Sequence, residues 1–237
     1  ASLSRARPMD FAAGYFRRPP MTAYKSDVDT AAAILLTPGG LDLDALETGL
    51  GYAMGAGIDY ADLYFQRTWQ EGWVLEDSEV KEASYNIDGG VGVRSLAGEK
   101  TGFAYSNQIT ADALMDTGRT AAGIVRSGKR LPGQLVSPVS AMSRYAGIDP
   151  LAGLSAEEKV AMLKQADRVA RAADPSISQV SASLSGTYEV VLVRASDGTL
   201  AADIRPLVRF NVSVIAVKNG RRERGSAGGG GRSSMAK

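Results

Sequence analysis

Alternating apolar and polar residues dominate the chain and predict a mostly antiparallel sheet. Within residues 59–69, three apolar side chains alternate with more polar ones, which is typical of a strand with one buried face; the apolar ones are Ala61, Leu63 and Phe65. The following stretch, residues 73–107, contains short β-favouring runs separated by polar and glycine-bearing turns. We expect these turns at Asp77-Ser78, Asp88-Gly89-Gly90 and Gly98-Glu99-Lys100. The stretch is therefore predicted to be a meander of four strands, around which the rest of the chain is arranged.

A second alternating region follows between residues 176 and 217. Its hairpin turns are expected at Ser196-Asp197-Gly198 and at Asn219-Gly220. The next segment, GSAGGGG at residues 225–231, matches neither GxxxxGK[ST] nor a GxGxxG loop between strand and helix. We therefore expect a flexible linker, or a loop packed against another backbone, in preference to a phosphate-binding loop.

Spacing close to the helical period predicts helices at residues 30–36, 43–57, 110–126 and 154–173. Two of them begin with the spacing of a capping box: Asp44 with Glu47, and Ser155 with Glu158. The apolar face expected for the last helix consists of Met162, Leu163, Ala166, Val169 and Ala170.

This order of elements predicts an α+β fold with two regions of mostly antiparallel sheet and packed helices. Residues 1–27, rich in arginine and proline, are expected to be an unstructured or artefactual leader, and residues 28–130 an N-terminal α+β domain. Residues 131–150 contain prolines and glycines that interrupt any regular pattern and are predicted to be a linker. A second α+β domain is expected at residues 151–232, with an unmatched tail at 233–237.

The amino-acid composition excludes several kinds of catalytic and metal site, although it says little about the fold. The sequence has no histidine and no cysteine, so it lacks the preferred ligands of zinc, any thiolate nucleophile and any Ser-His-Asp triad. Basic residues exceed acidic ones by only one, which gives no electrostatic reason to expect nucleic acid as a partner. No apolar run is long enough for a membrane span.

Two groups of charged residues are candidate sites. An acidic cluster could supply paired carboxylates, although solvent-exposed strand edges are the more ordinary interpretation; it comprises Glu71, Glu76, Asp77, Glu79 and Glu82. Residues around Pro206 could form the ion-paired wall of a substrate channel. The alternative interpretation is a buried Asp/Arg pair with a structural role. The substrate-channel candidates, to which two arginines of the basic C-terminal segment are added, are Asp203, Arg205, Arg209, Arg224 and Arg232.

Several stretches resemble the TldD/PmbA family, specifically its TldD branch of metalloproteases. They are DYADLYFQ (59–66), WVLED…YNIDGGVGVR (73–94), GEKTGFAYSN (98–107), the segment 181–214 and GRRERGSAGGGGR (220–232). The resemblance implies a cytoplasmic zinc-dependent peptidase that acts on unfolded or leader peptides with a TldE/PmbA-like sister subunit or with itself. The family's metal motif, HExxxH, cannot be mapped onto a chain without histidine. No catalytic or metal-binding residue is therefore carried over, and this chain alone is expected to bind no zinc and to be inactive.

The resemblance implies that this is a truncated or frameshifted N-terminal portion that forms part of the substrate cavity wall and the subunit interface. Two alternatives stay open: a non-catalytic binding or regulatory module, such as a peptidase partner or a modulator of DNA gyrase, and a non-functional gene fragment. Neither a membrane nor direct contact with nucleic acid is expected.

Overall fold

The computed structural model describes residues 26–126, 147–233 and 235. Its strands form one antiparallel sheet of six strands in the order β3-β2-β1-β4-β5-β6. The strands are β1 (Tyr60–Glu76), β2 (Glu79–Ala97), β3 (Lys100–Ser106), β4 (Ile177–Ala195), β5 (Leu200–Lys218) and β6 (Arg221–Gly231). The predicted α+β class is confirmed. Most of the predicted leader (1–27), residues 1–25, and most of the predicted linker, 131–146, lie outside the described residues. The last two residues of the predicted leader, Ser26 and Asp27, are the N-cap and first residue of α1.

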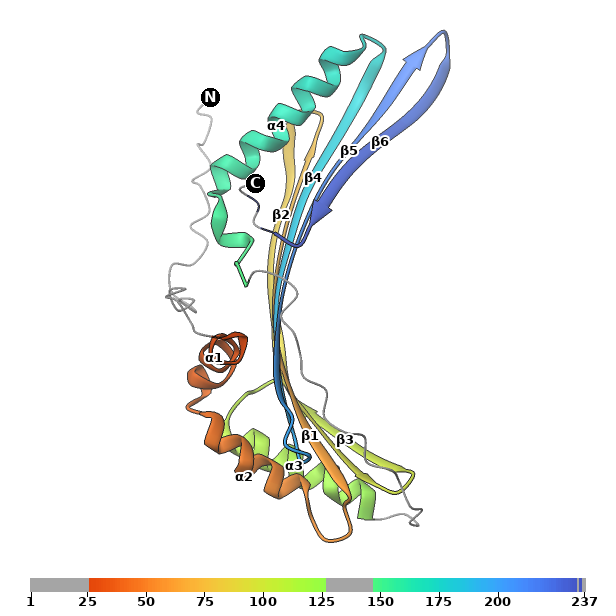
Figure 1. The fold of residues 1–237 in the computed structure, drawn as a ribbon. Helices are drawn as coiled ribbons and strands as arrows, with labels where there is room; N and C mark the ends of the chain where they lie inside the picture. The colour runs from red at the N-terminus through yellow and green to blue at the C-terminus, as the bar shows by residue number, and fades with distance from the viewer. Residues whose placement is uncertain (1–25, 127–146, 234, 236–237) are drawn as a thin grey trace, which may run out of the picture.

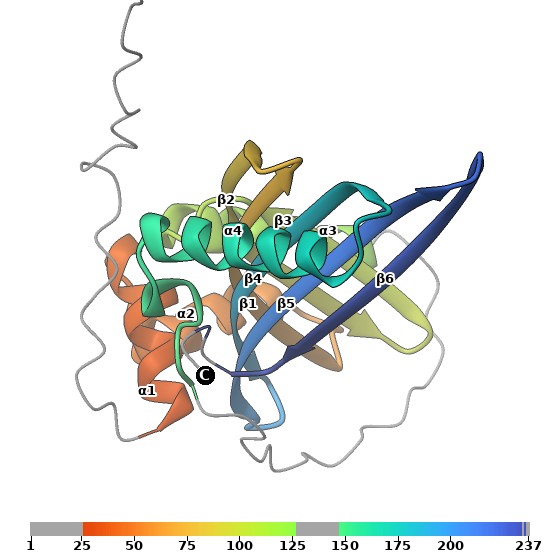
Figure 2. The ribbon, with the colours of Figure 1, turned by 90° about the horizontal axis from the view of Figure 1, so that it is seen from above.

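The helices lie on the convex side of this strongly curved sheet (Figure 1). They are α1 (Asp27–Ala31), which continues through a π turn (Ala32–Leu36) and a 3-10 turn (Thr37–Gly39), then α2 (Leu43–Ala53), α3 (Ala111–Arg126), a 3-10 turn (Leu151–Gly153) and α4 (Ala156–Ala173). Helices α2 and α3 cover one end of the sheet, and α4 covers the other, chiefly on β4 and β1. The β5–β6 hairpin extends outward beyond α4 (Figure 2).

The core lies between the helices and the convex face of the sheet. Leu63 and Phe65 of β1 are fully buried, and each pairs with a neighbour on β2 that points the same way, Val93 and Val91. Because side chains alternate between the faces of a strand, burial of these apolar positions leaves the polar ones on the concave side.

Strands from the two predicted domains pair along almost their full length. Residues Asp62–Glu76 of β1 pair with Ser181–Ala195 of β4, so one sheet runs through both regions. The division into two domains stays a prediction, but both contribute to a single concave surface.

The predicted turn at Asp88-Gly89-Gly90 is wrong, because β2 runs through it without interruption. The stretch 73–107 therefore contains the end of β1 and all of β2 and β3. A Cβ added to Gly89 would lie 2.6 Å from the carbonyl oxygen of Gln66, and one added to Gly90 would lie 2.1 Å from that of Ser106. These glycines permit close approach of neighbouring strands, which a turn signal in the sequence does not distinguish. The turns at Asp77-Ser78 and Gly98 are present.

Helix starts were predicted with mixed success. Ser155 and Glu158 form the expected capping box at α4. At α2 the cap is Asp42, whose side chain accepts from the backbone N–H of Ala45 at 2.8 Å; the prediction of Asp44 was wrong by two residues. Both are aspartates that can accept from a free N–H, so composition alone could not choose between them.

The glycine-rich segment 225–231 is neither a linker nor a loop. It forms most of β6, the edge strand that follows the hairpin turn at Asn219-Gly220. The face of α4 that packs against the sheet also differs from expectation. Met162 and Val169 were expected on it but are exposed, whereas Lys159 and Asp167 are buried with Leu163.

No helix in the described part of the chain is long and apolar enough to cross a membrane.

Candidate binding face

The concave face of the sheet carries every second residue of the six strands and is covered by none of the described helices (Figure 1). It is mainly polar in the middle and at the β6 end. Its members include Gln66, Thr68, Gln70, Asp88, Ser181, Ser183, Thr187, Asn211, Ser213 and Ser226. An uncovered, concave and polar sheet face is suited to contacts with a ligand or partner more than to a core.

Two of the predicted channel residues meet at the centre of this face. The Arg205 side chain donates to Asp203 at 2.6 Å and to Glu189, from the neighbouring strand β4, at 2.7 Å. The hydrogen bond with Asp203 is the largest cause of the raised pKa of Arg205. All three side chains are partly exposed, so the group is an ion-paired surface and not the buried pair considered as the alternative.

A tyrosine lies beside this ion-paired group. Burial is the main cause of the raised pKa of Tyr64, and the Glu189 carboxylate raises it further. Farther along the same face, Arg94 donates to Asp62 through two nitrogens, and burial together with the Asp62 charge raises the pKa of Tyr60. Both tyrosines therefore stay neutral at physiological pH and can serve as hydrogen-bonding groups.

The end of the face formed by β1–β3 holds an aromatic hollow of about 410 Å³. Tyr64, Phe103 and Tyr105 line it together with Asp88 and the glycines of β2. Phe103 is 57% exposed and Tyr105 is 78% exposed, which is unusual for large aromatic side chains.

The opposite end, formed by β4–β6, holds a second hollow of about 470 Å³. It contains two more of the predicted channel residues, Arg209 and Arg224, with serines and Asn211 between them. We call it the arginine hollow. Arg232, the last predicted residue, lies in a bend after β6, is exposed and does not line this hollow. The structure thus brings the predicted residues to one face in two groups and leaves Arg232 outside them.

The acidic cluster does not form a pair of catalytic carboxylates. The Glu71 side chain is 10% exposed and lies on the convex side, where Lys159 of α4 donates to both of its oxygens at 2.7 and 2.9 Å. Asp77 is engaged by Arg171 and Glu79 by Lys81. Glu76 and Glu82 are exposed on the strands. Solvent exposure was therefore the right interpretation for most of the cluster, and wrong for Glu71.

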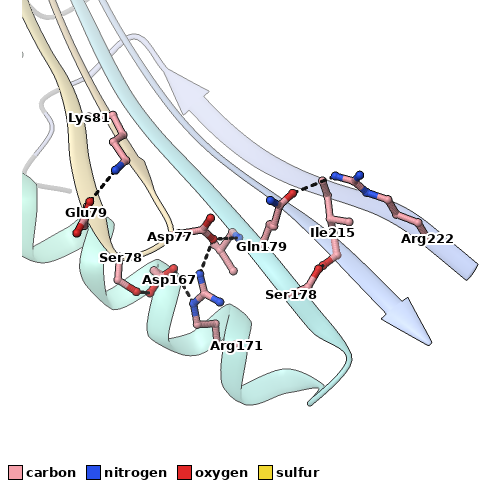
Figure 3. Close-up of polar contacts among 11 residues, drawn as sticks. Asp77, Ser78, Glu79, Lys81, Asp167, Arg171, Ser178, Gln179, Ile215 and Arg222 are labelled. Carbon is pink, nitrogen blue, oxygen red and sulfur yellow. Dashed lines mark hydrogen bonds and ion pairs between the residues drawn. The ribbon is translucent and has the colours of Figure 1, made fainter. Parts of the chain in front are cut away.

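Helix α4 is attached to the tip of the β1–β2 hairpin by polar contacts (Figure 3). Arg171 donates to Asp77 at 2.7 Å and to Asp167 at 3.1 Å, and Ser78 donates to Asp167 at 2.6 Å. The hydrogen bond from Arg171, followed by one from the backbone N–H of Val180, lowers the pKa of Asp77. These contacts hold the tip of the β1–β2 hairpin against α4.

The residues of this chain do not fit a zinc centre. Zinc in proteins takes mainly His and Cys ligands, and the sequence has neither. Within the described ranges no cluster of three or more potential metal-binding side chains occurs.

Sequence reasoning missed Glu189 and the aromatic side chains Tyr64, Phe103 and Tyr105. Alternation indicates the solvent-facing side for Tyr64 and Glu189, because each lies between two buried residues. It is weaker for Phe103 and Tyr105, which share the half-buried neighbour Ala104. Alternation does not show which strands are adjacent, and the hollows form only where particular strands lie side by side.

Comparison with known proteins connects this fold to one family. A profile described as "PmbA/TldA metallopeptidase domain 1" matches residues 61–125, and one described as "PmbA/TldA metallopeptidase central domain" matches residues 149–236. The second match reaches into the segment 233–237, where Met235 is buried in the core.

Two similar sequences carry the name "Metalloprotease TldD homolog". The protein from Haemophilus influenzae is 50% identical over 200 residues, covering 84% of this chain and 42% of that protein. The protein from Buchnera aphidicola subsp. Acyrthosiphon pisum is 44% identical over 180 residues, covering 74% and 36%. The chain thus spans less than half the length of these relatives.

Solved structures show the same fold at low sequence identity. TldE from Thermococcus kodakarensis aligns with a TM-score of 0.66 at 15% identity, over 80% of this chain and 43% of that one. A putative modulator of a DNA gyrase from Thermotoga maritima aligns with a TM-score of 0.65 at 16% identity, over 80% and 43%.

Proposed function

The chain belongs to the PmbA/TldD family of metallopeptidases, and on that premise we propose that it is the non-catalytic portion of a TldD-like peptidase whose concave face forms part of the wall of the substrate cavity. The substrate is an unfolded or leader peptide. Zinc is the metal that we propose for the complete enzyme, where it would be held by residues outside this chain, which has no His or Cys, and would supply a Lewis acid for peptide hydrolysis. The site of action is the cytoplasm.

The observation that supports this role is the combination of a concave face that no described helix covers with a glycine-rich edge strand. β6 is the last strand of the sheet, and its residues from Arg221 to Gly230 are exposed. An extended peptide can pair its backbone with such an edge, whereas a folded protein has already paired its own backbone. Since glycine presents no side chain, the pairing places few demands on the peptide sequence. Selection for unfolded chains follows from this geometry.

The test is binding of a labelled, unstructured twelve-residue peptide to the 237-residue chain, followed by fluorescence anisotropy. The matched control is the same peptide with alternate backbone nitrogens methylated, which removes the N–H donors needed for strand pairing and keeps the side chains. We expect binding of the unmodified peptide and a loss of at least tenfold on methylation, because several charge-neutral hydrogen bonds are lost together. Equal binding of both peptides would contradict edge pairing.

Contact with a TldE/PmbA-like sister subunit, or with a second copy, is the second part of the proposal. The exposed aromatic side chains of the first hollow, Phe103 and Tyr105, support it, because exposed aromatic residues are enriched where proteins bind one another. Sedimentation of the chain with and without the sister subunit tests this part. Phe103→Ser is expected to reduce co-sedimentation, and an unchanged profile would remove the aromatic hollow from the interface.

A further inference from the structure

The arginine hollow is built by three neighbouring strands in a regular way. Ser181 of β4 pairs with Ser213 of β5, and Ser213 pairs with Ser226 of β6, so three hydroxyl groups form one row across the sheet. Arg224 belongs to β6 on one side of this row, and Arg209 belongs to β5 on the other side. The hollow of about 470 Å³ between them is large enough for one or two side chains of a ligand.

Arg209 is oriented into the hollow by a neighbouring amide. Its Nε donates to Oδ1 of Asn211 at 3.2 Å, and Asn211 in turn needs the space left by Gly228 on the adjacent strand. A Cβ at Gly228 would lie 2.2 Å from that same Oδ1. The glycine therefore allows Asn211 to hold the guanidinium beside the row of serines.

The charges of the hollow are not neutralised. Arg209 and Arg224 make no ion pair within the described residues, whereas Arg94, Arg171, Arg194 and Arg205 each contact a carboxylate. No acidic residue lines the hollow. Among residues paired with the strands of the hollow, the nearest acid on this face is Glu76 of β1. It pairs with Ser181 across β4, on the side away from β5. Among the described residues, two cations and a row of hydroxyl donors thus line one hollow without an acidic side chain between them.

A carboxylate suits this arrangement. A guanidinium presents paired N–H donors that match the two oxygens of a carboxylate, and serine hydroxyl groups can donate to the remaining lone pairs. A nucleic-acid backbone suits it less, because Asp62, Asp88, Glu189 and Asp203 lie along the same concave face and would repel a longer row of phosphates.

We infer that the arginine hollow is a carboxylate subsite that recognises an acidic side chain or the terminal carboxylate of an extended peptide lying along the concave face beside β6. This inference rests on the proposed function and adds a preference to it: peptides with a carboxylate at one position bind more tightly than their amide counterparts. Backbone pairing supplies general affinity for unfolded chains, and the hollow fixes the register of the peptide.

The experiment measures binding of four labelled twelve-residue peptides to the 237-residue chain: one with a single internal Glu, one with Gln at that position, and each with a free or an amidated C-terminus. Binding of the unsubstituted chain is compared with that of Arg209→Gln and Arg224→Gln. The matched control is Arg221→Gln, which removes the same charge from β6, where Arg221 contacts Glu223 on the opposite face. Circular dichroism verifies that each variant is folded.

We expect the carboxylate-bearing peptide to bind roughly tenfold more tightly than the amide form, since one charged hydrogen-bonded contact has about that effect. Arg209→Gln and Arg224→Gln abolish the difference, while Arg221→Gln keeps it. A difference between the Glu and Gln peptides would identify an acidic side chain as the ligand. A difference between the free and amidated C-termini would identify the terminal carboxylate. Gly228→Ala is expected to reduce the preference through Asn211, and Arg209→Lys to retain only part of it.

Four results would overturn the inference. Equal binding of all four peptides would refute the subsite and leave the peptide-binding wall standing, whereas absence of any peptide binding would refute both. An equal effect of Arg221→Gln would show that net charge, and not the hollow, attracts the peptide. Displacement of the acidic peptide by single-stranded oligothymidylate at equal concentration would assign the arginines to phosphate binding instead.

Discussion

At the scale of single residues, the glycines of β6 have two distinct roles that the sequence does not separate. Gly230 lies against the neighbouring strand, where an added Cβ would be 2.4 Å from the carbonyl oxygen of Val208. Gly229, one position earlier, has nothing within 4 Å of the same added atom. In the run GGGG, glycine is therefore sterically required at position 230, whereas position 229 has room for a side chain.

This contrast gives a prediction with an internal control. Gly230→Ala is expected to destabilise the β5–β6 hairpin by about 1–3 kcal/mol, because a backbone atom cannot move aside as the end of a side chain can. Gly229→Ala should be neutral or slightly stabilising, because alanine restricts the unfolded chain. Urea denaturation of both variants measures the free energies of unfolding. Equal values would show that the strand pairing is looser than the structure indicates.

A second prediction at this scale concerns pH. The folded state lowers the pKa of Asp77 below its ordinary 3.8, chiefly through the hydrogen bond from Arg171. A lowered pKa means that the contribution to stability is present above the unfolded value and disappears as the pH falls through the folded one. Asp77→Asn should therefore lower the melting temperature at pH 7, and the gap should close between about pH 4 and pH 2.

The control for this experiment is Glu82→Gln, an exposed position on the same hairpin that makes no ion pair within the described residues. Its melting temperature should match the unsubstituted chain across the same range. A gap for Asp77→Asn that persisted undiminished at pH 2 would show that the effect does not arise from the carboxylate charge.

At the scale of elements, α4 is attached by charged groups where an apolar stripe was expected. Lys159 and Glu71 are 88 residues apart in sequence, and their side chains are only 5% and 10% exposed. Two buried charges that satisfy each other add little net stability, but removing one leaves the other buried without compensation. The pair therefore fixes where the helix lies on the sheet more than how strongly it is held.

Lys159→Met is accordingly expected to lower the free energy of unfolding by about 3–5 kcal/mol. The double substitution Glu71→Leu with Lys159→Met should recover most of that loss, because neither charge then stays buried. Chemical denaturation of the single and double variants gives the comparison. A double variant as unstable as the single one would mean that hydrogen bonds to Leu151 and Trp73, and not the charge pair, hold α4.

At the scale of the whole molecule, the proposed function predicts that this chain is inactive by itself. We expect no peptidase activity from the 237-residue chain with or without added zinc, since its sequence has neither of the preferred zinc ligands. Hydrolysis of a fluorogenic unfolded peptide, with and without a chelator, is the measurement. Zinc-dependent cleavage that co-purifies with the chain and disappears with the chelator would contradict this expectation.

Much of the fold followed from the sequence because its signals are local. Alternation assigned Leu63 and Phe65 to a buried face, and Asn219-Gly220 located a hairpin with both residues at positive φ. The same local rules failed at Asp88-Gly90, where glycines mark close packing between strands, and at α4, where Lys159 and Asp167 are buried by partners far away in sequence.

By itself the sequence determined most of the strands, the buried face of β1, the hairpin turns at Asp77-Ser78 and Asn219-Gly220, most of the helices and the absence of zinc ligands, since each depends on residues close together or on composition alone. Only the tertiary structure decided that β1 pairs with β4, that the described helices lie on the convex side, and that Arg209 and Arg224 border one hollow. The physical reason is that pairing between residues more than a hundred positions apart depends on how whole faces pack, and no repeat of two or 3.6 residues encodes that choice.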